Sequence, residues 1–337
     1  MRLVSAATSA ALVTILLAAT PPASAAKPAA PLAHTYSIVA RDPETGALGV
    51  AVQSHWFQVG VLVTWAEAGV GAVATQSFVE PAYGPKGLAL MKSGKSAQAA
   101  LDELLAADPQ KEVRQVAFVD ACGNAAGWTG AKCIQAAGNV TAKGYSVQAN
   151  LMDKATVWPA MAKAYEGSAG KPFAERLILA LEAAEKEGGD IRGRQSAALL
   201  IVKPTATGDP WRDTLVNIRV DESSDPLKEL RRIYTLHLAY ESMNAGDAAV
   251  AENKMEEALV HYSAAAKLAP QIVELPFWQA VQLFVVGRED EALGIFRKVF
   301  RQEPRWARLV PRLPAAGLLP DDPEKIKKIL SVASATR

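Results

Sequence analysis

The chain has 337 residues, which is long enough for two domains that each bury a core. Half of the residues are hydrophobic and 21% are charged, a balance typical of globular rather than disordered proteins. The 36 Lys and Arg against 35 Asp and Glu leave a net charge of +1, which provides no basic excess for binding nucleic acid. The 4 His and 2 Cys lack zinc-ligand spacing, so we expect neither a metal site nor a cofactor.

The first 25 residues have the pattern of a secretory signal. Arg2 supplies a positive charge before an apolar run over 4–19, and small residues at 23–25 precede the expected cut. We predict a Sec-type signal peptide over 1–25, a flexible leader over 26–34, and a periplasmic or secreted bacterial protein. The alternative is an uncleaved anchor, although the run is short for a span of about 20 strongly apolar residues. After signal cleavage we expect no membrane-spanning segment.

Residues 35–221 alternate between strand and helix patterns. Ser96 can cap a helix whose apolar residues share one face, and a helix pair is expected over 156–186. The expected strands are 36–40, 48–52, 59–65, 70–75, 113–119, 125–129, 145–151, 195–203 and 214–220. Because strands leave and return in hairpins, the sheets should be antiparallel, and two helical blocks must cover them. This predicts an α+β fold with a four-layer αββα sandwich.

Beyond the polar segment 222–226, every long stretch has a helical pattern. Small, aromatic, small and proline residues at 258, 262, 265 and 270 recur 34 residues later, at 292, 296, 299 and 304. This resembles the tetratricopeptide repeat, in which small residues let paired helices pack closely. A generic pair of helical hairpins is the alternative. We predict an all-α tetratricopeptide-like domain over 227–333, separable by proteolysis near Ser223 and Ser224 and available for a protein partner.

The common hydrolase and nucleotide-binding motifs are absent from the sequence, including G-x-S-x-G, H-E-x-x-H and the P-loop. Polar residues instead gather at the ends of neighbouring predicted strands, where they need hydrogen-bond partners or a ligand. These clusters are Gln53-Ser54-His55, Glu67, Thr75-Gln76-Ser77, Gln148 with Asn150, and Arg192-Gly193-Arg194-Gln195-Ser196. The alternative is that they are turn and edge residues whose polar groups bond to the backbone.

Several collinear segments of the first half resemble one family. The matching segments are 35–43, 46–54, 66–76, 83–85, 129–133, 145–150 and 192–199. They are similar to the domain of unknown function numbered 1028, which is placed among the N-terminal-nucleophile (Ntn) hydrolases and often precedes an extra C-terminal domain. The resemblance covers about residues 35 to 233 and implies an αββα sandwich with, by analogy, amidase-type chemistry. His55 stands where the family usually carries Lys, so a charge at that position would depend on pH.

An Ntn hydrolase attacks with its first mature residue, whose α-amine has a pKa of about 7.7 to 8.0 and accepts the proton. Thr35 heads the first strand and is the expected nucleophile, with Glu67 and Asn150 as further catalytic residues. The remaining polar residues would bind a small-molecule or peptide substrate; they are Gln53, His55, Thr75, Gln76, Gln148 and Arg194. Signal cleavage after Ala25 leaves residues 26–34 in place, so a second cut before Thr35 is required.

The main hypothesis is an exported hydrolase that cleaves an amide or related acyl bond of an uncharacterised substrate. Cys133 or Ser37 as an internal nucleophile is one alternative. Another is an inactive scaffold that acts through its helical repeats, binding a protein or the cell envelope. We expect Cys122 and Cys133 to stay unbonded, because strands of about six residues would hold them roughly 20 Å apart, beyond the about 7 Å that a disulfide tolerates. The alternative is that residues 130–133 fold back along the hairpin and bring the two cysteines together.

Overall fold

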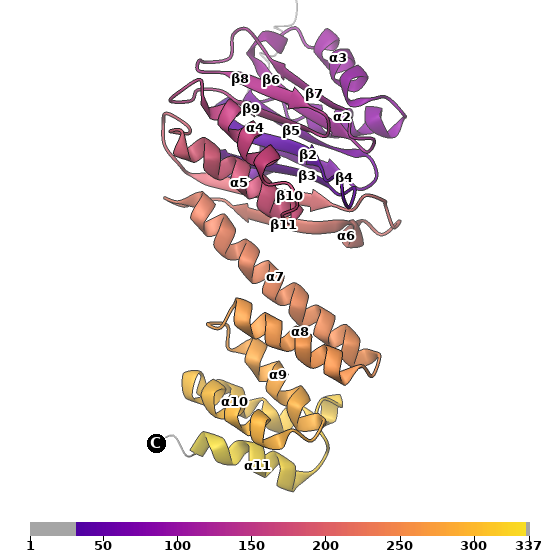
Figure 1. Cartoon of the computed structure of the whole chain (residues 1–337), viewed down its shortest axis with the longest axis vertical. Helices are drawn as coiled ribbons and strands as arrows, with labels where there is room; N and C mark the ends of the chain where they lie inside the picture. The colour runs from indigo at the N-terminus through magenta and orange to yellow at the C-terminus, as the bar shows by residue number, and fades with distance from the viewer. Residues whose placement is uncertain (1–31, 335–337) are drawn as a thin grey trace, which may run out of the picture. The chain divides into compact units, whose positions relative to one another are not determined.

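The computed structural model describes residues 32–334 (Figure 1). The predicted signal peptide and residues 26–31 of the predicted leader lie outside these residues. Within 32–334 no helix combines the length and apolar character that crossing a membrane requires.

Two antiparallel sheets make up the first part of the described chain. One sheet has the order β1-β5-β6-β7 with β4 beside β5, and the other has the order β11-β10-β3-β2-β9-β8. The strands are β1 Leu32–Ala33, β2 Thr35–Arg41, β3 Leu48–Ser54, β4 Thr64–Glu67, β5 Gly71–Phe78, β6 Arg114–Asp120, β7 Ala125–Thr129, β8 Gly138–Ala142, β9 Tyr145–Ala149, β10 Ser196–Val202 and β11 Thr214–Val220. The antiparallel pairing that the hairpin connections predicted is confirmed.

Two helix pairs flank the sheets. Helices α2 Tyr83–Lys92 and α3 Ala97–Ala107 pack on β5, β6 and β7, while α4 Val157–Gly167 and α5 Phe173–Lys186 pack on β2, β3 and β9 (Figure 1). Because successive strand residues point to opposite faces, Ile38 packs in the cluster of α4 and α5 and Val39 in the cluster between the sheets. As predicted, Ser96 caps α3, its side chain accepting from the backbone N–H of Ala99.

Residues 59–65 were predicted as a strand, and this is wrong. The structure has a short helix, α1 Val59–Val63, followed by β4. Gln58 adopts the left-handed conformation that starts the helix, and a Cβ at Gly60 would lie 2.6 Å from that of Ala198 on β10. Close packing of this helix on the neighbouring sheet outweighs the β-propensity of its valines.

The end of the predicted leader also differs from expectation. Leu32 and Ala33 form β1, which pairs with Phe78 and Ser77 at the end of β5. Ala33 and His34 are buried. The edge of β5 offers unpaired backbone groups, and the leader satisfies them by adding a strand. Residues 32–34 therefore belong to the fold rather than to a flexible segment.

Two short elements lie within the sheet region, the 3-10 helix η1 Lys111–Val113 before β6 and α6 Pro210–Asp213 before β11. From residue 226 onward the described chain is helical. Its elements are α7 Pro226–Ala251, α8 Met255–Leu268, α9 Glu274–Val285, α10 Glu289–Gln302, the 3-10 helices η2 Pro304–Arg308, η3 Val310–Arg312 and η4 Pro314–Ala316, and α11 Pro323–Ser334. The small and aromatic positions of the 34-residue repeat are buried, Ala258 and Tyr262 on α8 and Ala292 and Phe296 on α10. The repeat positions therefore supply the packing faces of these helices.

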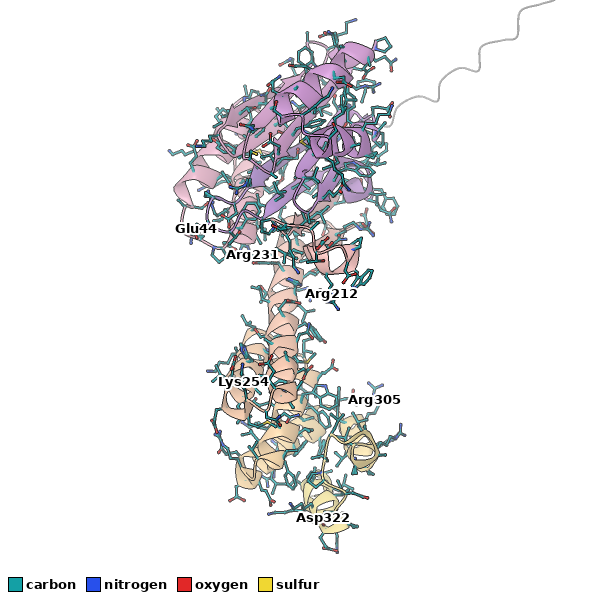
Figure 2. The ribbon with its side chains drawn as sticks, turned by 90° about the vertical axis from the view of Figure 1, so that its right-hand side faces the viewer. Glu44, Arg212, Arg231, Lys254, Arg305 and Asp322 are labelled. Carbon is teal, nitrogen blue, oxygen red and sulfur yellow. The ribbon has the colours of Figure 1, made fainter. Side chains whose placement is uncertain are left out.

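The first turns of α7 belong to the core of the sheets. Leu227, Leu230 and Tyr234 lie in the same hydrophobic cluster as α4 and α5. Arg231, labelled on α7 in Figure 2, bonds to Glu175 and Glu182 of α5 at 2.8 and 2.7 Å. The helix that follows the predicted boundary at 222–226 therefore contributes its first turns to the core of the sheets.

Candidate functional site

Thr35 lies where the chain passes from one sheet to the other. Strand β1 pairs with β5, His34 crosses the space between the sheets, and β2 begins at Thr35 beside β3. The Thr35 side chain is fully buried. Its Oγ1 donates to the carbonyl of Ala33 at 2.7 Å and lies 3.1 Å from the Oγ of Ser54.

The carbonyl oxygen of His34 accepts two strong hydrogen bonds. Ser54 Oγ donates to it at 2.5 Å and Arg192 Nη2 at 2.7 Å. Arg192 is held in place by Asp190, whose two carboxylate oxygens accept from it at 2.7 and 3.0 Å. Two donors, one of them charged, polarise this carbonyl and would stabilise negative charge on its oxygen. The carbonyl of the peptide bond before Thr35 therefore has two side-chain donors.

The imidazole of His34 is buried in an uncharged state. Its Nδ1 lies 2.8 Å from Asn150 Oδ1, and its ring meets Phe78 edge to face. The Asn150 amide nitrogen donates to the carbonyl of Thr35 and to Gln115 Oε1, so Oδ1 is the acceptor and His34 Nδ1 carries the proton. Burial lowers the pKa of His34 below its usual value.

Buried amides between the sheets fix the backbone around Thr35. Gln76 Nε2 donates to the carbonyl of Thr35 at 3.1 Å and to Gln115 Oε1 at 2.7 Å. Gln148 Nε2 donates to Ser37 Oγ at 2.6 Å, and Ser37 Oγ donates in turn to Gln76 Oε1 at 2.6 Å. A network with partners for each of these groups holds the start of β2 in one position.

The structure brings four of the predicted site residues together: Thr35, Gln76, Gln148 and Asn150. His55 lies at the margin, where its backbone N–H donates to Asp190 Oδ2 at 3.2 Å. Its buried Nδ1 has no hydrogen-bond partner among the described residues.

Two predicted residues, Gln53 and Thr75, point away from Thr35. With its amide nitrogen facing the acceptors, Gln53 donates to the Tyr36 hydroxyl and to Glu185 of α5, on the outer face of its sheet. Thr75 donates to the carbonyl of Glu80 on the α2 side of the other sheet. Strand alternation gives the reason, because each has a neighbour, Ser54 or Gln76, on the face between the sheets.

Glu67 and Arg194 do not join the site either. Glu67 pairs with Gly71 at the opposite end of β5, about 17 Å along the strand from Gln76, and forms an ion pair with Lys92. Arg194 bonds to Glu185 at 2.5 Å on the outer side of the sheet. Both residues lie near strand ends, as predicted, but the sheet topology places Glu67 far from Thr35 along β5 and Arg194 on the outer side of the sheet.

The family model described as "Family of unknown function (DUF1028)" matches residues 35–230. The chain belongs to the DUF1028 family. A crystal structure of the DUF1028 protein SPO2555 from Silicibacter pomeroyi is 30% identical, with a TM-score of 0.53 over 60% of this chain and 88% of that chain. Anbu (ancestral beta-subunit) from Yersinia bercovieri is 12% identical, with a TM-score of 0.32 over 59% of this chain and 93% of that chain. No curated protein matches the sequence.

Sequence reasoning missed half of the site of this DUF1028 domain. The omitted residues are His34, Ser54, Gln115, Asp190 and Arg192. Ser54 and Arg192 stood within the polar clusters, and strict strand alternation would have selected Ser54 over Gln53. His34 was assigned to the leader, and only the crossing from β1 to β2 places it at the centre.

The two internal nucleophiles considered for the DUF1028 domain are poorly placed. Burial raises the pKa of the Cys133 thiol, and its Sγ lies 3.3 Å from the carbonyl of Arg114, so the reactive thiolate is disfavoured. The Ser37 hydroxyl bonds only to neutral amides, none of which can accept its proton as a base. Cys122 and Cys133 are both free thiols. Within residues 32–334 no group of His, Cys, Asp and Glu is arranged to hold a metal ion.

Proposed function

We propose that this protein is an exported hydrolase of an amide or related acyl bond, with Thr35 as an N-terminal nucleophile released by cleavage between His34 and Thr35. The observation that carries the proposal is the pair of donors, Ser54 and Arg192, on the carbonyl of the bond to be cut. The hydroxyl that would attack belongs to Thr35, whose nitrogen forms the bond to be cut. The buried amides hold the Thr35 backbone in place.

The cleavage is an N-to-O acyl shift followed by hydrolysis. Thr35 Oγ1 adds to the carbonyl carbon of His34, and the oxyanion stays bonded to Ser54 and Arg192. The C–N bond breaks as the nitrogen takes up the hydroxyl proton, which leaves an ester of His34 on Thr35. This step already frees the α-amine of Thr35. Water then hydrolyses the ester, which frees the Thr35 hydroxyl and leaves His34 with a terminal carboxylate.

In the processed enzyme, the free α-amine of Thr35 takes the proton from Oγ1 when the hydroxyl attacks a substrate. Departure of residues 32–34 would vacate the space of His34, so a substrate acyl group can take its place. Its carbonyl oxygen would then meet the same Ser54 and Arg192 donors. A peptide fits this site because β1 itself is bound as an added strand.

The wider architecture is proposed on the same basis. Two helix pairs, two sheets and three hydrophobic clusters support an αββα Ntn sandwich in four layers. The buried 34-residue pattern on α8 and α10 supports a tetratricopeptide-like module for protein or envelope contacts. The signal pattern of residues 1–25 supports the proposal that the protein is periplasmic or secreted.

The test is the N-terminus of the mature protein, measured by intact mass and N-terminal sequencing of the exported chain. The wild type should begin at Thr35, and Thr35→Ser should still be cut. Thr35→Ala should retain residues 26–34. The control is Glu67→Gln, at a β4 residue that pairs with Gly71 at the far end of β5 and lies outside the site. This variant should be cut like the wild type.

An inactive scaffold is the second candidate, favoured by the full burial of Thr35 and its acylated nitrogen in the uncut chain. A wild-type chain that keeps residues 26–34 and binds a partner without hydrolysing anything would establish it. A chain that keeps residues 26–34 yet hydrolyses a substrate, with activity surviving Thr35→Ala, would eliminate the Thr35 mechanism altogether.

A further inference from the structure

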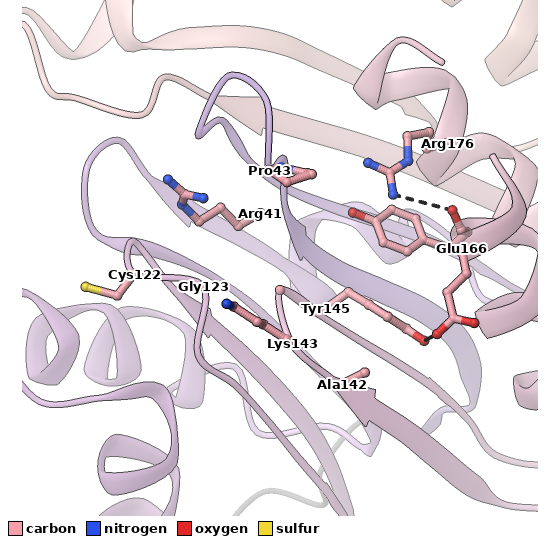
Figure 3. A pocket seen from close by; sticks show the side chains of 11 residues that line it. Arg41, Pro43, Cys122, Gly123, Ala142, Lys143, Tyr145, Glu166 and Arg176 are labelled. Atoms are coloured by element: carbon pink, nitrogen blue, oxygen red, sulfur yellow. Dashed lines mark hydrogen bonds between the residues drawn. The ribbon is translucent and has the colours of Figure 1, made fainter. Parts of the chain in front are cut away.

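A separate pocket of about 410 Å³ lies at the other end of β2 from Thr35 (Figure 3). Arg41, which ends β2, stands about 20 Å along the strand from Thr35. The pocket lies among the turn between β2 and β3, the hairpins β6-β7 and β8-β9, and the facing ends of α4 and α5. Its volume falls in the range of small-molecule sites, and no step proposed for Thr35 uses it.

Arg176 is the buried cation of this pocket. Only 7% of the residue is exposed, and the guanidinium lies 4.2 Å from the centre of the Tyr165 ring. Its contacts are weak: 3.7 Å to Asp42 and a single long hydrogen bond of 3.5 Å to the carbonyl of Tyr165. The Nε is buried without a partner among residues 32–334. A desolvated guanidinium has five N–H donors, so most of its donors await acceptors.

Two further cations line the same pocket. Arg41 Nε is also buried without a hydrogen-bond partner within the described part of the chain. Lys143, at the tip of the β8-β9 hairpin, is exposed and forms no ion pair with any described residue. Figure 3 shows Arg41, Lys143 and Arg176 on different sides of the pocket.

The carboxylates nearby do not neutralise these three charges. Glu166 lines the pocket but accepts from the Tyr145 hydroxyl at 2.5 Å, as Figure 3 shows. Asp42 accepts from the Thr45 hydroxyl at 2.6 Å and reaches only Arg176, at the distance of a weak ion pair. Three cations against two carboxylates leave a net positive charge, and the unpartnered donors belong to the cations.

From these contacts we propose that the pocket binds a small organic or inorganic oxyanion, a molecule that carries carboxylate or phosphate groups. Its oxygens accept from the guanidinium groups of Arg176 and Arg41, with Lys143 on the exposed side. Tyr145 and Tyr165, with ring centres 4.8 Å apart, line the rest of the pocket. Charge-assisted bonds of guanidinium to oxyanion have the strength and direction that these buried donors require.

Cys122 provides a direct readout of occupancy. This exposed thiol lines the pocket, whereas Cys133 is buried elsewhere. The full chain would be alkylated with neutral iodoacetamide, with citrate or inorganic pyrophosphate present, and with sodium chloride at matched ionic strength as reference. Mass mapping would follow each cysteine separately. Citrate tests the carboxylate source and pyrophosphate the phosphate source.

We expect at least one anion to slow Cys122 alkylation several-fold, with half-protection at or below about 1 mM. Lys143→Ala and Arg41→Gln should each raise the half-protecting concentration about 10-fold, as loss of one charge-assisted bond does. Lys163→Ala, an exposed lysine of α4 outside the pocket, should leave it unchanged. Cys133 staying unlabelled shows that each variant is folded.

Two results would overturn the proposal. One is the absence of protection by either anion at about 10 mM. The other is equal protection in Lys143→Ala, Arg41→Gln and Lys163→Ala, which would mean that the anions act on the whole surface.

Discussion

His34 and Thr35 are adjacent in the chain, but their side chains have different roles. His34 is buried and neutral, with its Nδ1–H bonded to Asn150. Thr35 carries the hydroxyl proposed to attack the His34 carbonyl. In the proposed mechanism, the uncut chain is a folded precursor, and its residues 32–34 and the proposed active site are joined by hydrogen bonds.

Acid should destabilise this precursor through His34. Because burial lowers its pKa in the folded state, the unfolded chain takes up a proton below about pH 6.5 that the folded chain does not. Stability in Thr35→Ala should therefore fall between about pH 6.5 and 5.5, by at most about 1.4 kcal/mol for this group. In the double variant that also carries His34→Gln, the free energy of unfolding measured with urea should no longer fall over this pH range. Above about pH 7 the free energies of the two variants should change in parallel with pH. Identical slopes throughout would contradict a neutral buried His34.

Ser54 and Arg192 should control the rate of cleavage before Thr35. Removing one donor to a developing oxyanion costs about 10²–10³ in rate, so Ser54→Ala and Arg192→Ala should accumulate uncut chain in a pulse-chase experiment. Thr75→Ala removes a hydroxyl from the neighbouring sheet, on its outer face, and serves as the control. Normal cleavage in Ser54→Ala would show that the donor pair is structural only.

At the scale of elements, α7 is shared between two cores. Its first turns contact β10, β11 and α5, and Arg231 joins it to two carboxylates of α5. Its later residues Ala239 and Ala249 pack with α8 and α9 instead. One continuous helix therefore serves both hydrophobic regions.

This predicts unequal effects for two leucines of α7. Leu230→Ala removes a fully buried side chain and should cost about 2–5 kcal/mol in the free energy of unfolding of the two-sheet region. Leu238→Ala, at a position 38% exposed on the same helix, should change it by less than about 0.5 kcal/mol. Urea unfolding followed by tryptophan fluorescence measures both. Equal values would mean that the start of α7 does not belong to the core that the sheet forms with α4 and α5.

On the scale of the whole molecule, α9, α10 and α11 have a core of their own around Phe277 and Phe296. Phe296→Ala should cost this core about 3–5 kcal/mol and raise hydrogen exchange in α9 and α10, with β2 still protected. Val260→Ala, 68% exposed on α8, should leave exchange unchanged. Loss of protection in β2 as well would show that the whole described chain unfolds as one unit.

The sequence by itself determined the elements whose signals are local. Short β-rich runs predicted β2, β3 and β6, Ser96 predicted the start of α3, and the hairpin connections predicted antiparallel sheets. The collinear motifs also identified the family correctly. These features depend on residues close together in the chain, so a single sequence contains them.

Only the tertiary structure decided which polar residues surround Thr35. The sequence predicted Gln53, Glu67, Thr75 and Arg194 at strand ends near the site. In the structure, strand pairing and the face on which each side chain lies keep all four away from Thr35. His34 reached the centre because β1 pairs with β5 in the opposite sheet from β2. Strand register and the choice of edge follow from burial between residues far apart in the chain, and no local pattern encodes that contact.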